Sequence, residues 1–334
     1  MIGRVECKNF AKMCPKPTCS EPKIAKGQCC KLCPDQESPA SSVFGSNANE
    51  DLKDFDYNYQ PDDQEFSALL TGRFDSIPVL TEGVGRAYLT YYLKNVHYSV
   101  HFERLEESPT GLLILNDDGV ILHEQKIHSL GHSKKPFERQ FGCPKRSLNG
   151  FQICGVWEDL PRLYLKMLRR RELKIVVATA KQPDGAIGGR IHKPKGLAKE
   201  AFSSLLFPSG LRGSIGLGYG GMAVFDLKSG GHVMAATIWL NASVNMNKFA
   251  SISDQPVLLH VEKNDGRRKQ LKSYKTKLSV EEGLLKVKAT LKLGSIEQRW
   301  LAKGQLLVSL TSPYLAPTEF LGLVTPKENC NSNF

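Results

Sequence analysis

"ELKIVVATAKQPDGAIGGRI" (residues 172–191) contains a run of aliphatic and β-branched residues, a turn marked by proline, and a short second run that ends in glycines. The same layout returns near the end of the chain in "QLLVSLTSPYLAPTEFLGLV" (305–324), where Gly322 holds the place of Gly189. Short apolar runs bounded by turn residues are typical of β-strands. Each stretch is therefore predicted to form a strand, a turn and a closing strand.

Three further blocks repeat in the same order, and such repeats take precedence over isolated motifs. The pairs are FSALLTG (66–72) with FSSLLFPSG (202–210), 85–102 with 220–240, and 111–119 with 257–266. All are short and rich in β-branched and aromatic residues, which favours antiparallel sheets over alternating βαβ units. We predict a mainly β fold in which two similar antiparallel β-sandwich domains, 65–192 and 201–326, are joined by a basic linker, 193–200.

One stretch, EDLPRLYLKMLRRREL (158–173), has helical periodicity. We expect a short helix near 159–170, with Asp159 as a candidate cap and Pro161 in its first turn. Its predicted apolar stripe leaves Leu165 off the buried side and consists of Leu160, Leu163, Tyr164, Met167 and Leu168.

Cysteine is concentrated at the start of the chain. Of the nine cysteines, six lie in the first thirty-three residues: Cys7, Cys14, Cys19, Cys29, Cys30 and Cys33. Such density usually compensates for a small core in an oxidising compartment, so we expect a secreted protein. Cys29, Cys30 and Cys33 also offer thiolates for zinc, but adjacent cysteines and the lack of any histidine before His97 favour disulfides. Six cysteines pair in fifteen ways, and spacing does not select one.

The first residues, MIGRVECKNF, lack the charged and apolar regions of a signal peptide, so we expect the sequence to be a piece of a longer chain. The net charge of +11 is uneven. Residues 35–64 hold eight acids against one base, a local charge of −7 that leaves +18 on the remainder. Residues 35–64 are predicted to be a flexible acidic linker. The basic remainder suits polyanions such as sulfated glycosaminoglycans, or is simply a solvated surface.

The cysteine pattern of residues 4–34, V-x-C, C-P-x-P-x-C and G-x-C-C-x-x-C-P, resembles the C-terminal half of a von Willebrand factor type C module. The first four of that module's usual ten cysteines are missing. The two β repeats resemble CHRD domains, and 153–206 is similar to the junction between two CHRD domains in the chordin and short gastrulation family. The resemblance implies the organisation 1–34 type C half-module, 35–64 linker, 65–192 and 201–326 CHRD domains around the linker 193–200, and 327–334 tail.

Members of this family are secreted antagonists of bone morphogenetic proteins in dorsal-ventral patterning. The resemblance thus implies no enzymatic activity, no cofactor, no metal, no nucleic-acid partner and no membrane span. It implies that the type C piece contacts the growth factor, and the candidate contacts are Pro15, Pro17, Pro22 and Ile24, unless these only shape turns. The alternative function is an extracellular-matrix structural or adhesion protein without growth-factor affinity.

The acidic linker suggests regulation by proteolysis. Proteins of this family are inactivated by tolloid-type metalloproteases that favour aspartate just after the scissile bond, which makes Asp51, Asp54 and Asp56 cleavage candidates. An extended, accessible backbone is what a protease requires. The alternative is a solvated spacer.

Three further sites concern the β repeats. Cys143 and Cys154, eleven residues apart, suit a disulfide-closed loop, and the family resemblance then places the partner of Cys330 beyond Phe334. Asn241 is the acceptor of an N-x-S sequon and would be glycosylated if it lies in an exposed turn. The basic run Arg169, Arg170 and Arg171 would bind heparan sulfate or matrix, be cleaved by a convertase, or form a solvated helix end.

Enzymatic readings have little support. GLGYGG (216–221) matches G-x-G-x-x-G, but the strand-like residues after it predict a glycine-rich turn rather than a phosphate-binding helix start. His97 and His101, with His123 or His128, are a remote candidate for a copper or zinc cluster on a sandwich. Histidines in sheets are more often surface or hydrogen-bonded core residues.

Overall fold

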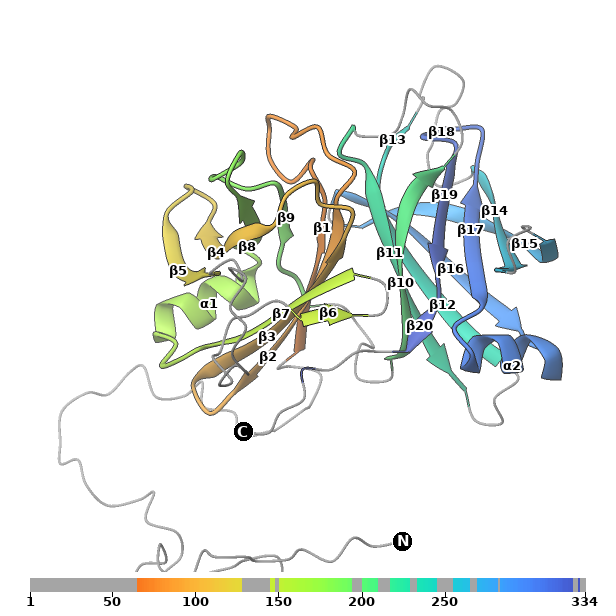
Figure 1. Cartoon of the computed structure of the whole chain (residues 1–334), viewed down its shortest axis with the longest axis horizontal. Coiled ribbons are helices and arrows are strands. Elements are labelled where there is room, and N and C mark those ends of the chain that lie inside the picture. The colour runs from red at the N-terminus through yellow and green to blue at the C-terminus, as the bar shows by residue number, and fades with distance from the viewer. Residues whose placement is uncertain are drawn as a thin grey trace, which may run out of the picture. The chain divides into compact units, whose positions relative to one another are not determined.

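The computed structural model describes residues 65–127, 145–147, 150–193, 200–209, 217–228, 233–244, 255–264, 269–281, 283–326 and 330. These residues form antiparallel sheets and two short helices, which confirms the predicted mainly β fold (Figure 1). Neither helix in this part of the chain has the length and apolar composition needed to cross a membrane.

The strands up to residue 190 form two sheets, which we call the first sandwich. One sheet has the order β1-β2-β3-β7-β6: β1 (Glu65–Leu70), β2 (Val84–Tyr92), β3 (Asn95–Glu103), β7 (Gly150–Trp157) and β6 (Lys145–Ser147). The other has the order β5-β4-β8-β9: β5 (Ile121–Lys126), β4 (Pro109–Asn116), β8 (Leu173–Thr179) and β9 (Ile187–Arg190).

The core of the first sandwich follows from alternation along its strands. In β3, Val96, Tyr98, Val100 and Phe102 are buried while the residues between them are half-exposed, as period-two geometry requires when one face is covered. Their partners come from both sheets and include Phe66, Leu112, Ile114, Ile153 and Ile175. Each such side chain contributes roughly 1.5–3 kcal/mol on burial.

The strands from residue 200 onward form the second sandwich, in the order β11-β12-β16-β15-β14-β17-β19-β10-β20. They are β10 (Glu200–Ser209), β11 (Gly220–Leu227), β12 (Val233–Asn241), β14 (Pro256–Lys263), β15 (Lys269–Glu281), β16 (Leu284–Lys292), β17 (Leu306–Thr311), β19 (Glu319–Leu323) and β20 (Thr325–Pro326). A separate short pair is β13 (Ser243–Val244) with β18 (Leu315–Ala316). Since β10 also pairs with β11, the strands close into a ring.

Each sandwich contains an equivalent contact between its first strand and its closing strands, which we call the seam. The paired residues of the two seams fall in the same register. In the first, β1 meets the β9 segment through the bridges Ser67↔His192 and Thr71↔Gly188. In the second, β10 meets β20 and β19 through Ser203↔Thr325 and Phe207↔Leu321. Between these pairs the two backbones approach so closely that a Cβ at Gly189 would overlap the Leu69 carbonyl oxygen, and one at Gly322 would overlap that of Leu205. Both glycines are therefore required by contact between main chains.

The sandwiches differ on the side opposite this seam. In the second, the last residues of β15 pair with β16, whereas among the described strands β5 of the first pairs only with β4. Side chains join β5 to the other sheet instead. Tyr98 Oη of β3 donates to Gln125 Oε1 at 2.5 Å, and Gln125 Nε2 donates to the carbonyl of Cys154 in β7 at 3.4 Å. Burial raises the pKa of Tyr98, which keeps its hydroxyl a donor.

Helix α1 (Arg162–Arg170) matches the predicted helix, but its details differ. Asp159 does not cap it. The residue before the helix is Pro161, and Asp159 has a left-handed backbone whose N–H donates to Asn95 Oδ1 at 3.0 Å. The predicted stripe is also wrong at two positions, because Leu163 is 63% exposed while Leu165 packs against the core.

Helix α2 (Ser295–Ala302) was not predicted. It follows β16 just as α1 follows β7, so it belongs to the repeat even though the two helical sequences differ. Leu301 is its buried residue, and Glu297 in its first turn forms an ion pair with Lys272 of β15 at 2.7 Å. That ion pair holds the pKa of Glu297 below its usual value, the hydrogen bond from Lys272 being the main cause.

Candidate functional site

The two sandwiches pack against each other within the compact unit Tyr59–Phe334. Residues of β1 and β2 form an apolar cluster with residues of β10, β11 and β12, which we call the inter-sandwich cluster. All its members are at most 7% exposed. They are Leu69, Val84, Leu205, Phe207, Met222, Val224 and Trp239.

A polar clamp adjoins this cluster. Asn241 Nδ2, at the end of β12, donates to Thr71 Oγ1 at 3.0 Å and to the Arg73 carbonyl at 3.1 Å. In the other direction, Arg73 Nε donates to the Leu217 carbonyl at 2.9 Å, and its guanidinium lies 4.0 Å from the centre of the Tyr219 ring. The second sandwich thus donates neutral hydrogen bonds to the first through Asn241, and the first donates a charged one to the second through Arg73.

The predicted glycine-rich turn is confirmed where it is described, at residues 217–219. Gly218 has a positive φ of 73°, its N–H donates to the Thr81 carbonyl at 3.1 Å, and β11 follows at once. A Cβ at Gly218 would lie 3.1 Å from the Gly72 backbone. The turn therefore serves as a contact with the first sandwich and does not open a phosphate-binding helix.

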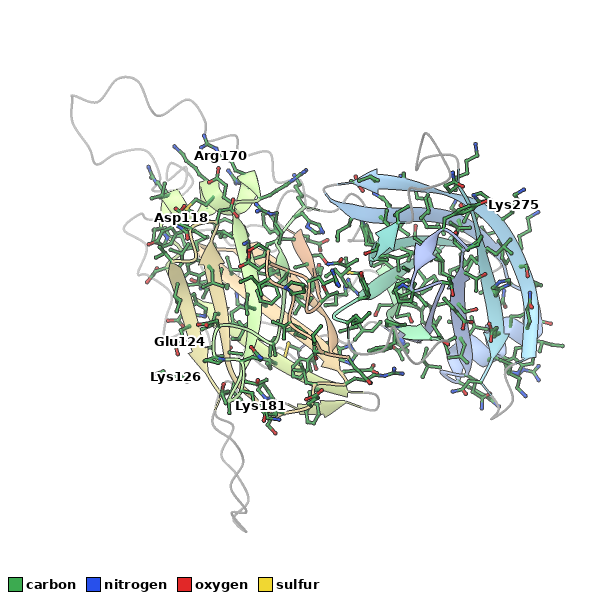
Figure 2. The ribbon with its side chains drawn as sticks, turned by 90° about the horizontal axis from the view of Figure 1, so that it is seen from above. Asp118, Glu124, Lys126, Arg170, Lys181 and Lys275 are labelled. Carbon is green, nitrogen blue, oxygen red and sulfur yellow. A yellow bond between two sulfur atoms is a disulfide. The ribbon has the colours of Figure 1, made fainter. Side chains whose placement is uncertain are left out.

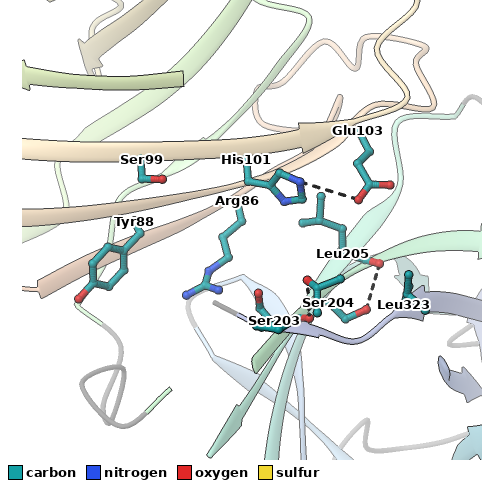
Figure 3. Close-up of a pocket in the computed structure, with 11 residues that line it drawn as sticks. Arg86, Tyr88, Ser99, His101, Glu103, Ser203, Ser204, Leu205 and Leu323 are labelled. Atoms are coloured by element: carbon teal, nitrogen blue, oxygen red, sulfur yellow. Dashed lines mark hydrogen bonds and ion pairs between the residues drawn. The ribbon is translucent and has the colours of Figure 1, made fainter. Parts of the chain in front are cut away.

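A small cavity lies between the outer face of β2 and β3 and the strands β10 and β20. Its volume is about 50 Å³, well below the roughly 300 Å³ at which small-molecule sites begin. Figure 3 shows the Arg86 side chain extending from β2 toward Ser203, with His101 and Glu103 beside it. His101 Nε2 is 3.9 Å from Glu103 Oε1. Burial first, and the Arg86 charge second, lower the pKa of His101 to about 4, so this imidazole is neutral at pH 7.

A disulfide joins Cys154 to Cys330, with the two Cα atoms 6.0 Å apart. This corrects the predicted Cys143–Cys154 pair and the predicted partner of Cys330 beyond Phe334. Cys154 lies on the outward face of β7, opposite Ser99 of β3, because its neighbours Ile153 and Gly155 face the core. Short spacing in sequence favoured Cys143, but Cys330 lies next to Cys154 at this outer face. Cys143 lies outside the described residues.

The structure also bears on the expected glycosylation at Asn241. The expectation required an exposed turn, but Asn241 is half-buried and its amide nitrogen makes both hydrogen bonds of the clamp. A glycan attaches to that nitrogen, where it would replace a donor hydrogen and occupy the space between Thr71 and Arg73. An attached glycan would compete with these hydrogen bonds, so we expect peptide mass spectrometry of the chain expressed through a secretory pathway to find Asn241 unmodified.

Changing Asn241 to Asp should lower the free energy of unfolding by about 2 kcal/mol. The carboxylate has nearly the same shape as the amide but cannot donate, so it would face the Arg73 carbonyl oxygen without a hydrogen. Urea unfolding followed by fluorescence measures the change. The exposed Asn264→Asp change is the matched control, and equal midpoints for the two variants would show that the clamp contributes nothing.

The basic run at the end of α1 is exposed. Arg169 and Arg170 close the helix and Arg171 follows with φ 66°, its carbonyl accepting a hydrogen bond from Arg190 Nη1 at 2.7 Å. Figure 2 shows the labelled Arg170 at the outer surface of the first sandwich. The three arginine side chains are therefore accessible to a ligand.

The histidines do not converge. His97 and His101 lie on the outer face of β3, whereas His123 stacks on Trp157 at 5.3 Å and lies 3.0 Å from the Tyr98 hydroxyl, on the opposite, inner face. Burial lowers the pKa of His123. Among the described residues no three His, Cys, Asp or Glu side chains gather as a metal site requires. His128 lies outside this part of the chain.

None of the predicted N-terminal site residues is among the residues that the structure describes. The following lie outside the described residues: the cysteines Cys7, Cys14, Cys19, Cys29, Cys30 and Cys33, the contact candidates Pro15, Pro17, Pro22 and Ile24, and the cleavage candidates Asp51, Asp54 and Asp56. Sequence reasoning in turn missed Arg86, Arg73 and Thr71, which carry no local motif and become neighbours of the second sandwich only through packing.

Comparison with known proteins supports the resemblance seen in the sequence. The CHRD domain model matches residues 66–191. Chordin of Xenopus laevis is 26% identical and chordin of Danio rerio 24% identical, each aligned over 99% of this chain and 34% of the relative. The dorsal-ventral patterning protein Sog of Drosophila melanogaster is 25% identical over 99% of this chain and 32% of its own length.

The chain therefore spans about a third of the length of the curated relatives it matches. The alignments run through both sandwiches and through the cysteine-rich and acidic segments before them. With the CHRD match and the repeated seam, they lead to one conclusion: residues 66–191 match a CHRD domain, and the chain is similar along 99% of its length to chordin and to the dorsal-ventral patterning protein Sog.

Proposed function

We propose that the chain is a secreted, non-enzymatic modulator of bone morphogenetic protein signalling in developmental patterning. The observation that carries the proposal is the alignment of 99% of the chain with chordin and with the dorsal-ventral patterning protein Sog. The proposed organisation keeps the predicted bounds: 1–34 type C half-module, 35–64 linker, 65–192 first CHRD domain, 193–200 linker, 201–326 second CHRD domain and 327–334 tail.

The proposed mechanism is sequestration without a cofactor. A disulfide-stapled type C piece has few side chains in a core, so its exposed apolar groups are available to a partner. The growth factor would meet Pro15, Pro17, Pro22 and Ile24 and lose access to its receptors. The paired sandwiches act as a spacer, and their packing against each other supports that role because it limits relative motion.

Titration of immobilised bone morphogenetic protein tests this function. We expect this chain to bind weakly and a chain preceded by a complete type C module to bind more tightly, because the module's N-terminal part adds contacts. Changing Pro15, Pro17, Pro22 and Ile24 to Ser should weaken both. Absence of binding by either chain would overturn the proposal and favour the matrix or adhesion alternative.

A tolloid-type metalloprotease should cut the acidic linker before Asp51, Asp54 or Asp56. Such enzymes favour aspartate after the scissile bond, so changing all three to Asn should remove the cut. Intact-mass analysis of the digest identifies the products. The matched control changes Asp62 and Asp63 to Asn, which alters the charge of the same linker. A digest unaffected by the first change would place the cleavage elsewhere.

Heparan sulfate is the proposed ligand of Arg169, Arg170 and Arg171. Changing the three to Ser should make the chain elute from immobilised heparin at lower salt, because exposed charges act through a field that salt screens. The control removes the same number of exposed charges from the second sandwich, at Lys275, Lys277 and Lys288. Equal shifts in both variants would show that only net charge matters and that the run forms a solvated helix end.

A further inference from the structure

The Cys154–Cys330 disulfide spans 176 residues and ties the two sandwiches together a second time. Cys154 belongs to β7 of the first sandwich, while Cys330 follows β20, the last strand of the second. The other covalent connection is the peptide chain from β9 to β10. Between the two cysteines lie α1, β8, β9 and every strand of the second sandwich.

The cysteine bridge sits where the packing between the sandwiches is polar. Buried Gln152, two residues before Cys154, donates to Ser99 Oγ at 2.9 Å, and its amide nitrogen lies 3.8 Å from Cys330 Sγ. The cavity with Arg86 and His101 occupies the same outer face. The inter-sandwich cluster, by contrast, involves the apolar residues of β1 and β2 and has no covalent bond across it. The disulfide therefore lies at the part of the contact between the sandwiches that hydrophobic burial stabilises least.

We propose that this closed loop makes the paired sandwiches resistant to separation by proteolysis. Hydrolysis of one peptide bond anywhere in 155–329 adds one water but leaves both products joined through the two sulfur atoms. Cuts at Arg169–Arg171 or in the linker 193–200 thus release nothing. Residues 35–64 lie outside the loop, so a cut there severs the cysteine-rich start from the sandwiches. A single cut before Cys154 therefore divides the chain, whereas a single cut between Cys154 and Cys330 does not.

The test inserts one specific protease recognition sequence into the full chain between Lys195 and Gly196. After cleavage to completion, we expect a single band in denaturing gels without reductant and two bands after reduction. Native size-exclusion chromatography should show the cut protein eluting with the uncut one. The same insertion in a Cys154→Ser, Cys330→Ser background should give two bands without reductant.

A second insertion of the same sequence between Asn47 and Ala48 is the positional control. Its cleavage should release the N-terminal fragment in denaturing gels without reductant. The proposal is overturned if the chain cut at Lys195 separates without reductant, or if peptide mapping finds Cys154 joined to a cysteine other than Cys330. It is equally overturned if the chain cut at Asn47 stays joined until reduced, because the first segment would then be tied as well. None of these readouts depends on growth-factor binding, so they stand apart from the proposed function.

Discussion

Gly189→Ala and Gly322→Ala should each destabilise the protein by about 3 kcal/mol, the upper range for overpacking in a well-packed site. In both repeats an added Cβ would overlap a main-chain carbonyl oxygen, of Leu69 in the first sandwich and of Leu205 in the second. Main chain held in a strand cannot rotate away as a side chain can. The bridges on both sides of each glycine would therefore have to open.

The midpoint of urea unfolding of the full chain measures this effect. Gly111→Ala is the matched control, because Gly111 also lies in a strand and its added Cβ would meet only the Gln125 carbonyl at 3.7 Å, an ordinary contact. We expect the control to keep its midpoint. Alanine variants at Gly189 and Gly322 that unfold with the control would show that the strands do not cross as closely as described.

Removal of the Cys154–Cys330 bond by the double change to Ser should lower stability by about 5 kcal/mol in the chain-entropy account, because the unfolded chain loses a 176-residue loop constraint. Under the same account the rejected Cys143–Cys154 pair would contribute only about 3 kcal/mol, since its loop is eleven residues. The two pairings therefore predict different losses in the free energy of unfolding when Cys154 can no longer form a disulfide.

Cys143→Ser provides the control for this change. With Cys154 bonded to Cys330, replacing Cys143 should leave the denaturant midpoint of the oxidised protein unchanged. Reduction of the parent protein should reproduce the midpoint of the double variant. A Cys143→Ser midpoint as low as that of the double variant would refute the Cys154–Cys330 pairing.

The local parts of the fold could be predicted from the sequence. Alternation in β3 places Tyr98 and Phe102 inside and His97 and His101 outside, and both positions follow from period-two geometry alone. The repeat also marked Gly189 and Gly322 as equivalent, since both lie in the short closing strand after a proline turn. The reason for these glycines could not be predicted, because the carbonyl that excludes a side chain comes from a strand more than a hundred residues away.

Long-range contacts explain the wrong predictions. Cys143 is close to Cys154 in sequence, but Cys330 reaches Cys154 only after the second sandwich has packed, and no local pattern carries that information. Asn241 has the sequon of a surface asparagine, yet Thr71 and Arg73 cover it from another sandwich. On α1, helical periodicity grouped Leu163 with the buried residues, while the direction from which the sheets approach favours Leu165.

The inter-sandwich cluster sets the smallest piece of this protein that can be studied alone. Expressed singly, either repeat would turn part of the cluster, Val84 or Trp239 for example, toward water, and such a patch promotes self-association. Dissection into single repeats would thus expose an apolar surface that the intact chain keeps buried. The pair of repeats, from residue 59 onward and with Cys330 included, is the natural unit for expression and binding studies.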